Sequence, residues 1–360
     1  MHGSGNPLVS IACGGTGGHF FPGVAAAREL QRQGARVSLW ISSKNVDCQA
    51  VMTVPDLEHY ELPAVGYNWK RPWQFLLGMR ASIRTVRGQM KLDTPRAVLA
   101  MGGFTAAAPI LEGQRLGAVT FLHESNAVAG RANRFLSRWV DEVFLGFDQK
   151  KEIFKCKSLI NTGTPVRKQF REAKMEESRR CLGFGLDKPL VLVLGGSQGA
   201  RGVNRLVVQA MGRIPEVQIL HLCGPHDLSE VNSAYASRKN CVQTHAFMAD
   251  MPSAMGAATV VITRAGASSL AELAAARVPS IVVPLPSSVD EHQLANAHAV
   301  VAEGGGIIAE EDNTSPKHLA HIISDLIHNE KKTESMAVGM RKLDRPDAAK
   351  VIATRIMERM

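Results

Sequence analysis

The sequence is poor in aromatic residues and lacks the cysteine spacing of a metal or redox motif. Phe, Trp and Tyr make up 5% of the 360 residues, whereas glycine reaches 32. This mixture suits an α/β protein with tight strand-to-helix turns better than an all-β sandwich. The six cysteines include no C-x-x-C pair, which argues against a zinc ribbon and a thioredoxin-like motif. At this chain length we expect reduced thiols rather than a disulfide framework.

Long apolar runs are missing as well. No stretch reaches 18 predominantly apolar residues, so no transmembrane helix is predicted. Residues 1–27 contain seven glycines and no Lys or Arg, which is unlike a signal peptide. Any membrane contact of this chain is therefore expected to be peripheral.

The sequence does have enough apolar material for two domains, and it has an excess of positive charge. With 45% hydrophobic and 21% charged residues, its composition is that of a soluble globular protein, and 360 residues suggest two domains. The formal net charge of +9 points to an anionic partner, such as a phosphate-bearing substrate, an anionic membrane or a nucleic acid. No helix-turn-helix or aromatic-interleaved basic surface is apparent, so we expect no nucleic acid.

Short apolar runs alternate with helical patterns in two series along the chain. Each series opens with an apolar strand, a glycine-rich turn and a helix. This helix is expected at 22–33 in the first series and at 203–211 in the second. This β-α-β repetition predicts two doubly wound parallel sheets. The expected strands lie at 8–12, 37–41, 97–101, 119–123, 142–145, 190–194, 218–223, 242–244, 259–263 and 280–283.

The domain boundary is expected in the polar, charged segment near 167–180. This gives an N-terminal domain at 1–166 and a C-terminal domain at 167–343. The remaining tail, 344–360, is charged and has a helical pattern around 348–357. We expect this tail to cross back and pack on the first domain.

The turn after the first strand reads Cys13-Gly14-Gly15-Thr16-Gly17-Gly18-His19. Its glycines allow positive φ and close backbone approach, and the following helix start offers amide hydrogens and a positive dipole end, which suit a phosphate. There is no Gly-Lys-Ser/Thr of a Walker loop, and Ser42-Ser43-Lys44 follows the second strand where a dinucleotide site needs a carboxylate. His19 can act as a general base; the alternative is a histidine that only packs.

Later segments repeat this arrangement. The run from Gly266 to Glu272 follows a strand and enters a helix, so its amides suit a diphosphate and Glu272 suits a ribose; a solvated helix charge is the alternative. Gln293 and Asn296 share a helix face, and their amides suit sugar hydroxyls. The other turns are Gly102-Gly103, His123-Glu124-Ser125-Asn126 and Gly195-Gly196-Ser197-Gln198-Gly199.

Taken in order, these segments resemble the MurG family of N-acetylglucosaminyltransferases, over residues 8 to about 300. The matching segments are 15–19, 123–126, 164–167, 195–200, 266–272 and the pattern Asp290-x-x-Gln293-x-x-Asn296. The resemblance implies the GT-B fold, an α/β architecture in which two Rossmann-like, doubly wound parallel-sheet domains face a cleft. It also implies transfer of N-acetylglucosamine from UDP-N-acetylglucosamine to undecaprenyl-diphosphate-linked lipid I, giving lipid II in peptidoglycan synthesis.

The resemblance also implies residue roles. The C-terminal domain would bind the UDP-sugar, with Glu272 at the ribose, Gln293 at the sugar and the backbone near Met248 at the uracil. The N-terminal domain would bind the acceptor, with His19 as the catalytic base. Further donor-binding residues implied are Thr16, Gly17, Gly18, Asn126, Arg167, Ser197, Ala267, Ser268, Ser269, Leu270 and Ala271, and Gly15, Gly102, Gly103 and Glu124 lie on the acceptor and diphosphate side.

Residues 66–96 carry seven basic residues and one acidic residue, which is +6 of the net charge of +9. The basic stripe of Arg80, Arg84, Arg87 and Lys91 and the tip at 69–77, with Trp73 and Phe75, are predicted to face an anionic membrane. Each basic residue near an anionic leaflet contributes roughly 1 kcal/mol. We therefore expect a peripheral protein at the cytoplasmic face of the cell membrane. The neighbouring apolar stripe, expected in the core, is Leu76, Met79, Ile83, Val86 and Met90.

The predicted reaction is an inverting transfer. The C4 hydroxyl of the N-acetylmuramyl group attacks the anomeric carbon of the donor, and His19 takes the hydroxyl proton. UDP leaves, and its growing negative charge is stabilised by the turn amides and helix dipoles of the second domain. No Asp-x-Asp motif is present, so we expect no obligatory metal and no cofactor beyond the nucleotide-sugar substrate. One alternative is another GT-B enzyme, such as a UDP-N-acetylglucosamine epimerase or a glycolipid glycosyltransferase. The other is an NAD-linked oxidoreductase, against which the missing carboxylate after Ile41 argues.

Overall fold

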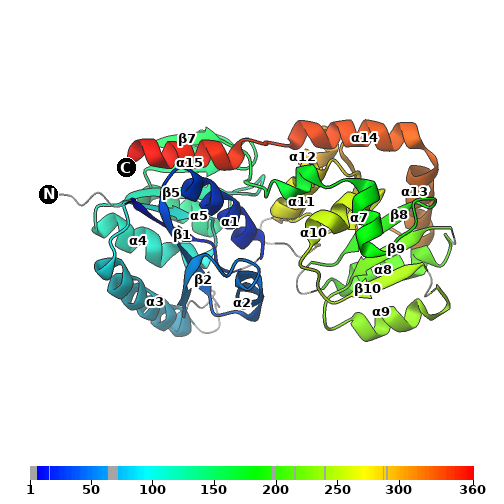
Figure 1. The fold of residues 1–360 in the computed structure, drawn as a ribbon, viewed down its shortest axis with the longest axis horizontal. Helices are drawn as coiled ribbons and strands as arrows, with labels where there is room; N and C mark the ends of the chain where they lie inside the picture. Colours follow the sequence, from blue (N-terminus) through cyan, green and yellow to red (C-terminus); the bar gives the residue numbers. More distant parts are fainter. Residues whose placement is uncertain are drawn as a thin grey trace. The chain divides into compact units, whose positions relative to one another are not determined.

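The computed structural model of the chain describes residues 6–15, 17–63, 72–196, 199–214, 216–238, 241–286, 288 and 291–360. The chain forms two compact units (Figure 1). Unit 1 consists of Met1–Arg167 and Arg345–Met360, and unit 2 consists of Lys168–Asp344. Unit 2 is thus inserted into unit 1, and each unit is built on one parallel sheet.

The sheet of unit 1 has seven parallel strands among the described residues, in the order β3-β2-β1-β4-β5-β6-β7. β1 lies between β2 and β4, with Ile11 opposite both Leu39 and Leu99. The strand order reverses at this point, where open α/β sheets place their ligands. The strands are β1 Leu8–Ala12, β2 Arg36–Ser42, β3 Glu58–Leu62, β4 Ala97–Ala100, β5 Val119–Glu124, β6 Glu142–Leu145 and β7 Ser158–Asn161.

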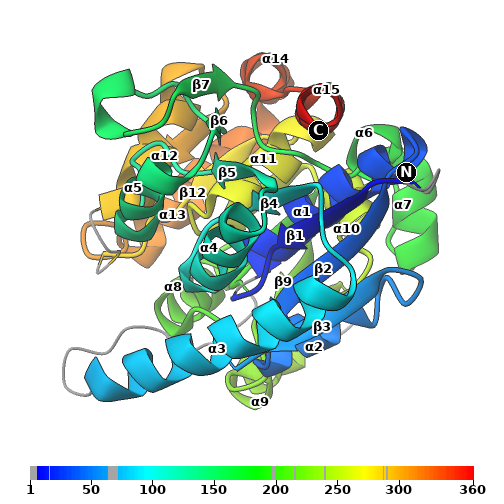
Figure 2. The same cartoon turned by 90° about the vertical axis from the view of Figure 1, so that its left-hand side faces the viewer.

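Helices cover both faces of this sheet because alternate strand residues point to opposite sides. Ile11 and Leu39 pack with α1, α2 and α15, whereas Trp40 packs with α3 and α4. Figure 1 shows α15 alongside α1, and Figure 2 shows α3 and α4 together on the other side of the sheet. The helices are α1 Gly17–Arg32, α2 Asn45–Val51, α3 Pro72–Leu92, α4 Ala107–Arg115, α5 Arg131–Leu136 and α15 Ala348–Arg359, with 3₁₀ turns η1 Phe104–Ala106, η2 Ser137–Trp139 and η3 Lys151–Ile153.

The sheet of unit 2 has six parallel strands among the described residues, in the order β10-β9-β8-β11-β12-β13. Here β8 lies between β9 and β11, so the strand order again reverses next to the first strand of the unit. The strands are β8 Leu190–Leu194, β9 Gln218–Leu222, β10 Val242–His245, β11 Val260–Thr263, β12 Ser280–Val282 and β13 Gly306–Ile308.

One face of this second sheet packs against α8 and α13, through Val191, Val203 and Ile323. α8 and α13 also contact each other, as α10 contacts α7 and α11. The helices are α6 Gln169–Glu172, α7 Met175–Leu182, α8 Arg201–Met211, α9 Leu228–Ala234, α10 Met251–Ala257, α11 Ala267–Ala276, α12 His292–Ala302, α13 Pro316–His328 and α14 Glu330–Leu343, with the 3₁₀ turn η4 Ala236–Arg238.

The predicted α/β fold with two doubly wound parallel sheets is confirmed. The first helix differs from the prediction, because it begins at Gly17 rather than at 22. Pro22 lies inside the helix and deprives it of one backbone hydrogen bond. The result is that the amides of Gly17 and Gly18 stand at the helix start, directly after the glycine turn. No described helix is both long and apolar enough to cross a membrane.

Candidate active site

The glycine turns after β1 and β4 lie side by side, because these strands are neighbours in the sheet. A Cβ atom on Gly14 would lie 2.3 Å from the amide nitrogen of Ser42, so only glycine allows the turn to pass β2 this closely. Gly15 follows with a φ of 111°. The carbonyl of Gly14 accepts a 2.7 Å hydrogen bond from Thr105 Oγ1, which ties the two turns together.

His19, in the first turn of α1, is partly buried against the second of these turns. Gly102 and Gly103 have φ angles of 102° and 78°. A Cβ atom on Gly102 would lie 3.4 Å from Nε2 of His19, and one on Gly103 would lie 3.1 Å from its Cε1. The two glycines therefore give the imidazole a close-fitting backbone surface.

Burial and the neighbouring polar groups shift the pKa of His19 in opposite directions. Burial lowers the pKa of His19, whereas the charges of Glu124 and Asp47 and a hydrogen bond to the backbone of Gly14 raise it. The net shift of the pKa is downward. A neutral imidazole near pH 7 is the form that a general base requires.

The neighbouring His123 is fully buried at the end of β5. Its Nε2 lies 3.1 Å from the carbonyl oxygen of Gly163, and its Nδ1 lies 3.1 Å from the hydroxyl of Ser125. Burial lowers the pKa of His123 to about 4. The segment 123–126 thus contains one histidine with a structural role, held neutral within the sheet edge.

Glu124 organises the loop that follows β5. Its buried carboxylate accepts hydrogen bonds from the amide of Asn126 at 2.9 Å, from Asn126 Nδ2 at 3.0 Å, from the amide of Gly130 at 2.8 Å and from Asn133 Nδ2 at 2.8 Å. The backbone carbonyl of Asn126 also accepts a 2.7 Å bond from Gln149 Nε2. Glu124 therefore holds Asn126 and Asn133 in place, and its expected place beside the acceptor stays a prediction.

Sequence reasoning missed the carboxylate that reaches the first glycine turn. Asp47, in the first turn of α2, is buried and accepts a 2.6 Å hydrogen bond from the Gly15 amide. No acid follows β2 directly in the sequence, but α2 brings Asp47 back from five residues further along. Lys44 was also missed; its Nζ lies 4.9 Å from the centre of the Phe104 ring, which packs beside Gly15.

The remaining donor-side residues that the structure describes in unit 1 lie at the start of α1 and at the end of the unit's first segment. Gly17 and Gly18 open α1, whereas Thr16 lies outside the described residues. The guanidinium of Arg167 lies 4.3 Å from the ring centre of Phe21, also on α1. A cation over an aromatic face is held in a preferred orientation, so Arg167 is tied to the same helix as His19.

In unit 2, the turns after β8 and β11 are neighbours in the same way. Gly195 is enclosed, since a Cβ atom there would lie 3.1 Å from the Leu222 carbonyl oxygen and 3.2 Å from the Ala200 amide nitrogen. Gly196 and Gly199 both have a positive φ, near 78°. Ser197, which we expected at the diphosphate, lies outside the described residues.

The turn after β11 leads into α11 through Gly266, which caps the helix without a side-chain hydrogen bond. The start of a helix suits an anion because of its amide hydrogens and positive dipole end. The amide of Leu270 donates to the Gly266 carbonyl at 3.0 Å within the first turn of the helix. The donor-binding roles predicted for Ala267–Ala271 stay predictions. Glu272 is partly buried one turn further on, and Met248 is partly buried in the loop after β10.

Gln293 and Asn296 both bind the backbone of Ala265, just before α11. Gln293 Oε1 accepts from the amide of Ala265 at 3.2 Å and from the amide of Leu285 at 3.0 Å, and Asn296 Nδ2 donates to the Ala265 carbonyl at 3.0 Å. These bonds orient the Gln293 amide with its Nε2 end away from the two backbone amides. Asn296 thus shapes the turn, and Gln293 links it to the loop at 285.

Arg264 is a second residue that sequence reasoning missed. Its guanidinium donates to the carbonyls of Val283 and Pro284, at 3.3 and 3.2 Å, and pairs with Glu311 at 2.5 Å. Arg264 thereby ties the turn after β11 to the loop after β12. The only sequence signal was a cation directly after a buried strand.

The predicted membrane-facing helix α3 has two distinct parts. Met79, Ile83, Val86 and Met90 pack in or against the core as expected, but Leu76 does not and is 59% exposed. It lies on the first turns of α3, before the part that packs on the sheet, together with Trp73 at 56% and Leu77 at 61% exposed. Phe75 is partly buried, and Trp69 lies outside the described residues.

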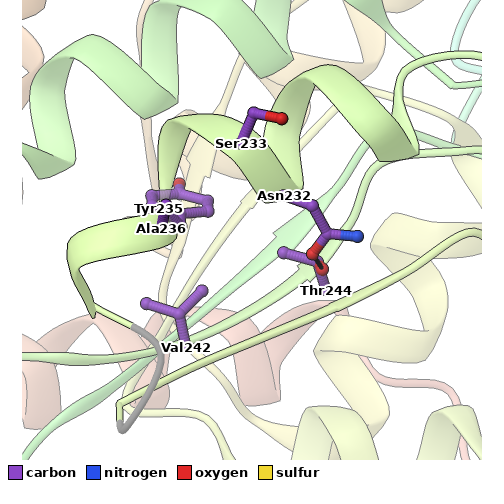
Figure 3. A pocket seen from close by; sticks show the side chains of 6 residues that line it. All are labelled: Asn232, Ser233, Tyr235, Ala236, Val242 and Thr244. Atoms are coloured by element: carbon purple, nitrogen blue, oxygen red, sulfur yellow. Dashed lines mark hydrogen bonds between the residues drawn. The ribbon is translucent and has the colours of Figure 1, made fainter.

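A pocket of about 390 Å³ lies elsewhere, between α9 and the edge strand β10 (Figure 3). Among its lining residues, Asn232 and Thr244 lie side by side and share a hydrogen bond, and the hydroxyl of Tyr235 lies 3.3 Å from Nδ1 of the buried His221. None of the predicted site residues lines this pocket. The glycine turns remain the candidate site.

Two family models match the chain. Residues 9–145 match the glycosyltransferase family 28 N-terminal domain, and residues 190–352 match the glycosyltransferase family 28 C-terminal domain. These two matches, together with two parallel-sheet units that carry glycine turns at the carboxyl ends of their central strands, place the chain among glycosyltransferases of the GT-B fold. The chain is accordingly a glycosyltransferase.

Similar proteins narrow the assignment. The UDP-N-acetylglucosamine–N-acetylmuramyl-(pentapeptide) pyrophosphoryl-undecaprenol N-acetylglucosamine transferase of Alkalilimnicola ehrlichii is 36% identical, over 97% of this chain and 98% of the relative. That of Paramagnetospirillum magneticum is 34% identical, over 96% and 95%. The crystal structure of Acinetobacter baumannii MurG superposes with a TM-score of 0.75, at 27% identity, over 98% of this chain and 99% of that chain. The chain belongs to the MurG family.

The same fold also serves other chemistry. The UDP-GlcNAc 2-epimerase of Neisseria meningitidis has a TM-score of 0.71 over 98% of this chain, at only 14% sequence identity. At that identity the likeness concerns the fold alone.

Proposed function

We propose that this chain transfers N-acetylglucosamine, with inversion, from UDP-N-acetylglucosamine to the C4 hydroxyl of N-acetylmuramyl-(pentapeptide) pyrophosphoryl-undecaprenol. The observation that supports it best is His19, a partly buried histidine held by the backbone of two glycine turns. In its neutral form this imidazole takes the proton of the acceptor hydroxyl as the new glycosidic bond forms. UDP is the leaving group.

Unit 2 is proposed to hold the donor. The amides of Ala267, Ser268 and Ser269 at the start of α11 suit the diphosphate, and they stabilise the charge that grows on UDP as it leaves. Glu272 suits the ribose hydroxyls, one helical turn away. The backbone near Met248 is assigned to the uracil, and Gln293 to the sugar.

Unit 1 is proposed to hold the acceptor and to lie against the membrane. The exposed first turns of α3, with Trp73 and Leu77, suit the interfacial region of a bilayer, and the exposed Arg80 and Arg84 suit its anionic headgroups. An acceptor on an undecaprenyl chain is confined to a membrane, so an enzyme held at the cytoplasmic face meets it without a spanning helix.

The reaction is tested by incubating the purified chain with radiolabelled UDP-N-acetylglucosamine, with and without a lipid I analogue. We expect label in the lipid fraction and release of UDP only when the acceptor is present. Acceptor-independent epimerisation of the sugar would instead assign the chain to the epimerases that share this fold.

The base is tested by His19→Ala. We expect kcat to fall by roughly 100-fold or more, because general-base catalysis contributes about that much, and the Kd for UDP to stay within about twofold. Turnover near that of the wild-type protein would remove His19 from this role and leave the donor assignment intact.

A further inference from the structure

Asp47 reaches the glycine turn that holds His19 from a different element of unit 1. Its side chain has no exposed surface. Its Oδ2 accepts hydrogen bonds from the Gly15 amide at 2.6 Å, from the Ser42 amide at 3.0 Å and from the Ser42 hydroxyl at 2.5 Å. Within the part of the chain that the structure describes, its Oδ1 is buried without a hydrogen-bond partner. An unpaired buried carboxylate oxygen is unfavourable, which points to a role beyond packing.

Asp47 and His19 bind the two ends of one peptide unit. The N–H of this unit belongs to Gly15 and donates to Asp47, whereas its carbonyl belongs to Gly14 and accepts from the imidazole of His19. A trans peptide is planar, with N–H and C=O pointing in opposite directions, so the two side chains lie at opposite edges of it. Linked hydrogen bonds polarise one another, so the carboxylate strengthens the carbonyl as an acceptor for the imidazole N–H.

The connecting peptide has little freedom to move. The Gly14 carbonyl also accepts the 2.7 Å hydrogen bond from Thr105 Oγ1. On the other side, Gly14 lies so close to β2 that a Cβ atom would meet the Ser42 amide nitrogen. A fixed peptide transmits the orientation set by Asp47 to the imidazole.

We propose that Asp47 is a positioning residue for the transfer reaction: through the Gly14–Gly15 peptide it fixes which ring nitrogen of His19 carries the proton, and therefore which one accepts the hydroxyl proton of the acceptor. This inference rests on the proposed function, in which His19 is the base. Asp47 exchanges no proton itself. It also supplies a negative charge that favours the imidazolium formed during transfer.

Among the described residues, two further titratable groups on β5 interact electrostatically with His19. They are Glu124, whose charge raises the pKa of His19, and His123, which burial holds neutral. Glu124 makes its four hydrogen bonds within its own loop, so Asp47 is the acid linked to His19 through a peptide. Because the Asp47 charge raises the pKa of His19, its neutralisation lowers that pKa further.

The test is the kinetics of Asp47→Asn, with Asp141→Asn as the matched control. Asp141 Oδ2 also accepts from the amide and the hydroxyl of one residue, Thr120, at 3.0 and 3.2 Å, but at the amino end of the strands. For Asp47→Asn we expect kcat to fall by roughly 10- to 100-fold, KM for UDP-N-acetylglucosamine to stay within about twofold, and the acid limb of the kcat–pH profile to move to lower pH. Asp141→Asn is expected to leave kcat and the acid limb unchanged.

An NMR titration of His19 in the folded protein, without substrates, measures the effect of Asp47 on the imidazole independently of turnover. We expect Asp47→Asn to lower the pKa of His19, and an unchanged titration overturns the inference. The pKa of His19 could fall as expected in Asp47→Asn while the wild-type chain transfers no sugar. In that case the proposed function fails, and the effect of Asp47 on His19 is retained.

A second variant decides the case if Asp47→Asn does not fold. Ser42→Ala removes one donor to Oδ2 and keeps the charge, so the carboxylate acts more strongly on the imidazole. We expect the pKa of His19 to rise in this variant. No change, or a fall, overturns the inference.

Discussion

Arg87 binds Glu112 through two parallel hydrogen bonds, from Nε to Oε2 at 3.0 Å and from Nη2 to Oε1 at 2.8 Å. Glu112 is buried on α4, and Arg115 adds a 2.9 Å bond to its Oε2. The Arg87 hydrogen bond lowers the pKa of the Glu112 carboxyl below its usual range. Arg87 is exposed like Arg80 and Arg84, earlier on α3, but its guanidinium is held by Glu112 and joins α3 to α4.

The double variant Arg80→Gln/Arg84→Gln is expected to bind anionic vesicles about 30-fold more weakly, because each basic residue contributes roughly 1 kcal/mol at such a surface. Arg87→Gln is the matched control. It should weaken vesicle binding less than either single change at 80 or 84 and should lower the thermal midpoint, since Glu112 loses its main partner. Vesicle flotation and thermal unfolding measure both effects. Equal loss of binding from all three single variants would contradict this division of roles.

Gly103→Ala is expected to reduce turnover roughly tenfold, because the new methyl group would lie 3.1 Å from Cε1 of His19 and displace the ring. Gly117→Ala is the control. Gly117 has a φ of 84°, similar to the 78° of Gly103, but a Cβ atom there meets nothing within 4 Å. Both variants place an alanine at a positive φ, but only the methyl group of Gly103→Ala meets the imidazole, so only Gly103→Ala should slow transfer. A similar loss of kcat in both would show that the ring contact is unimportant.

Glu272→Ala is expected to raise the Kd for UDP about tenfold, because the carboxylate is assigned to the ribose hydroxyls. Titration calorimetry with UDP and with 2′-deoxy-UDP separates this role from a general effect on α11. The wild-type protein should bind the deoxy ligand more weakly than UDP, and the variant should bind the two ligands equally. If the variant still distinguishes them, another group reads the ribose.

His123 and His221 are expected to make stability fall in mild acid. Burial lowers the pKa of each to about 4, whereas an unfolded histidine titrates near 6.5. Between these values the unfolded chain binds protons that the folded chain does not, so the free energy of unfolding decreases as the pH falls from about 6.5 to about 4. From about pH 7 to about pH 5 each histidine accounts for about 2 kcal/mol.

Urea unfolding at the two pH values measures this effect, with His221→Gln as the test variant. In this variant, the free energy of unfolding of unit 2 should depend less on pH, by about the contribution of one histidine. His221 lies 3.0 Å from Asn204 Oδ1 within a buried network, so the variant should also be less stable at neutral pH. An unchanged pH dependence would show that His221 is already protonated in the folded chain.

The central strands of both sheets could be predicted because they are buried on both faces and read as continuous apolar runs. β1 and β8 have the predicted bounds. The outer strands β3, β7 and β13 were missed, because edge strands are half-exposed and mix polar with apolar residues. Their pairing partners, rather than their own sequences, make them strands.

Within the candidate site, the glycine turns could be predicted because positive φ angles and close backbone approach require glycine itself. The contacts of Asp47, Arg264 and Gln293 could not. Each depends on a backbone group brought near by the fold, such as the Gly15 amide for Asp47 and the Ala265 amide for Gln293. A side chain that binds distant backbone leaves no periodic signal in its own sequence. The exposure of Leu76 was not predicted for a related reason. Helical spacing shows which face of α3 is apolar, but not how far along the helix the sheet covers that face.

The insertion of unit 2 into unit 1 governs the order in which the polypeptide can mature. The apolar face of α1 is closed by Ile352, Ala353 and Ile356 of α15, and Glu142 of β6 is paired by Arg355. These partners leave the ribosome only after all of unit 2 has been made. The apolar face of α1 therefore stays uncovered until α15 has been made, and a ribosome that stalls within unit 2 leaves this face exposed.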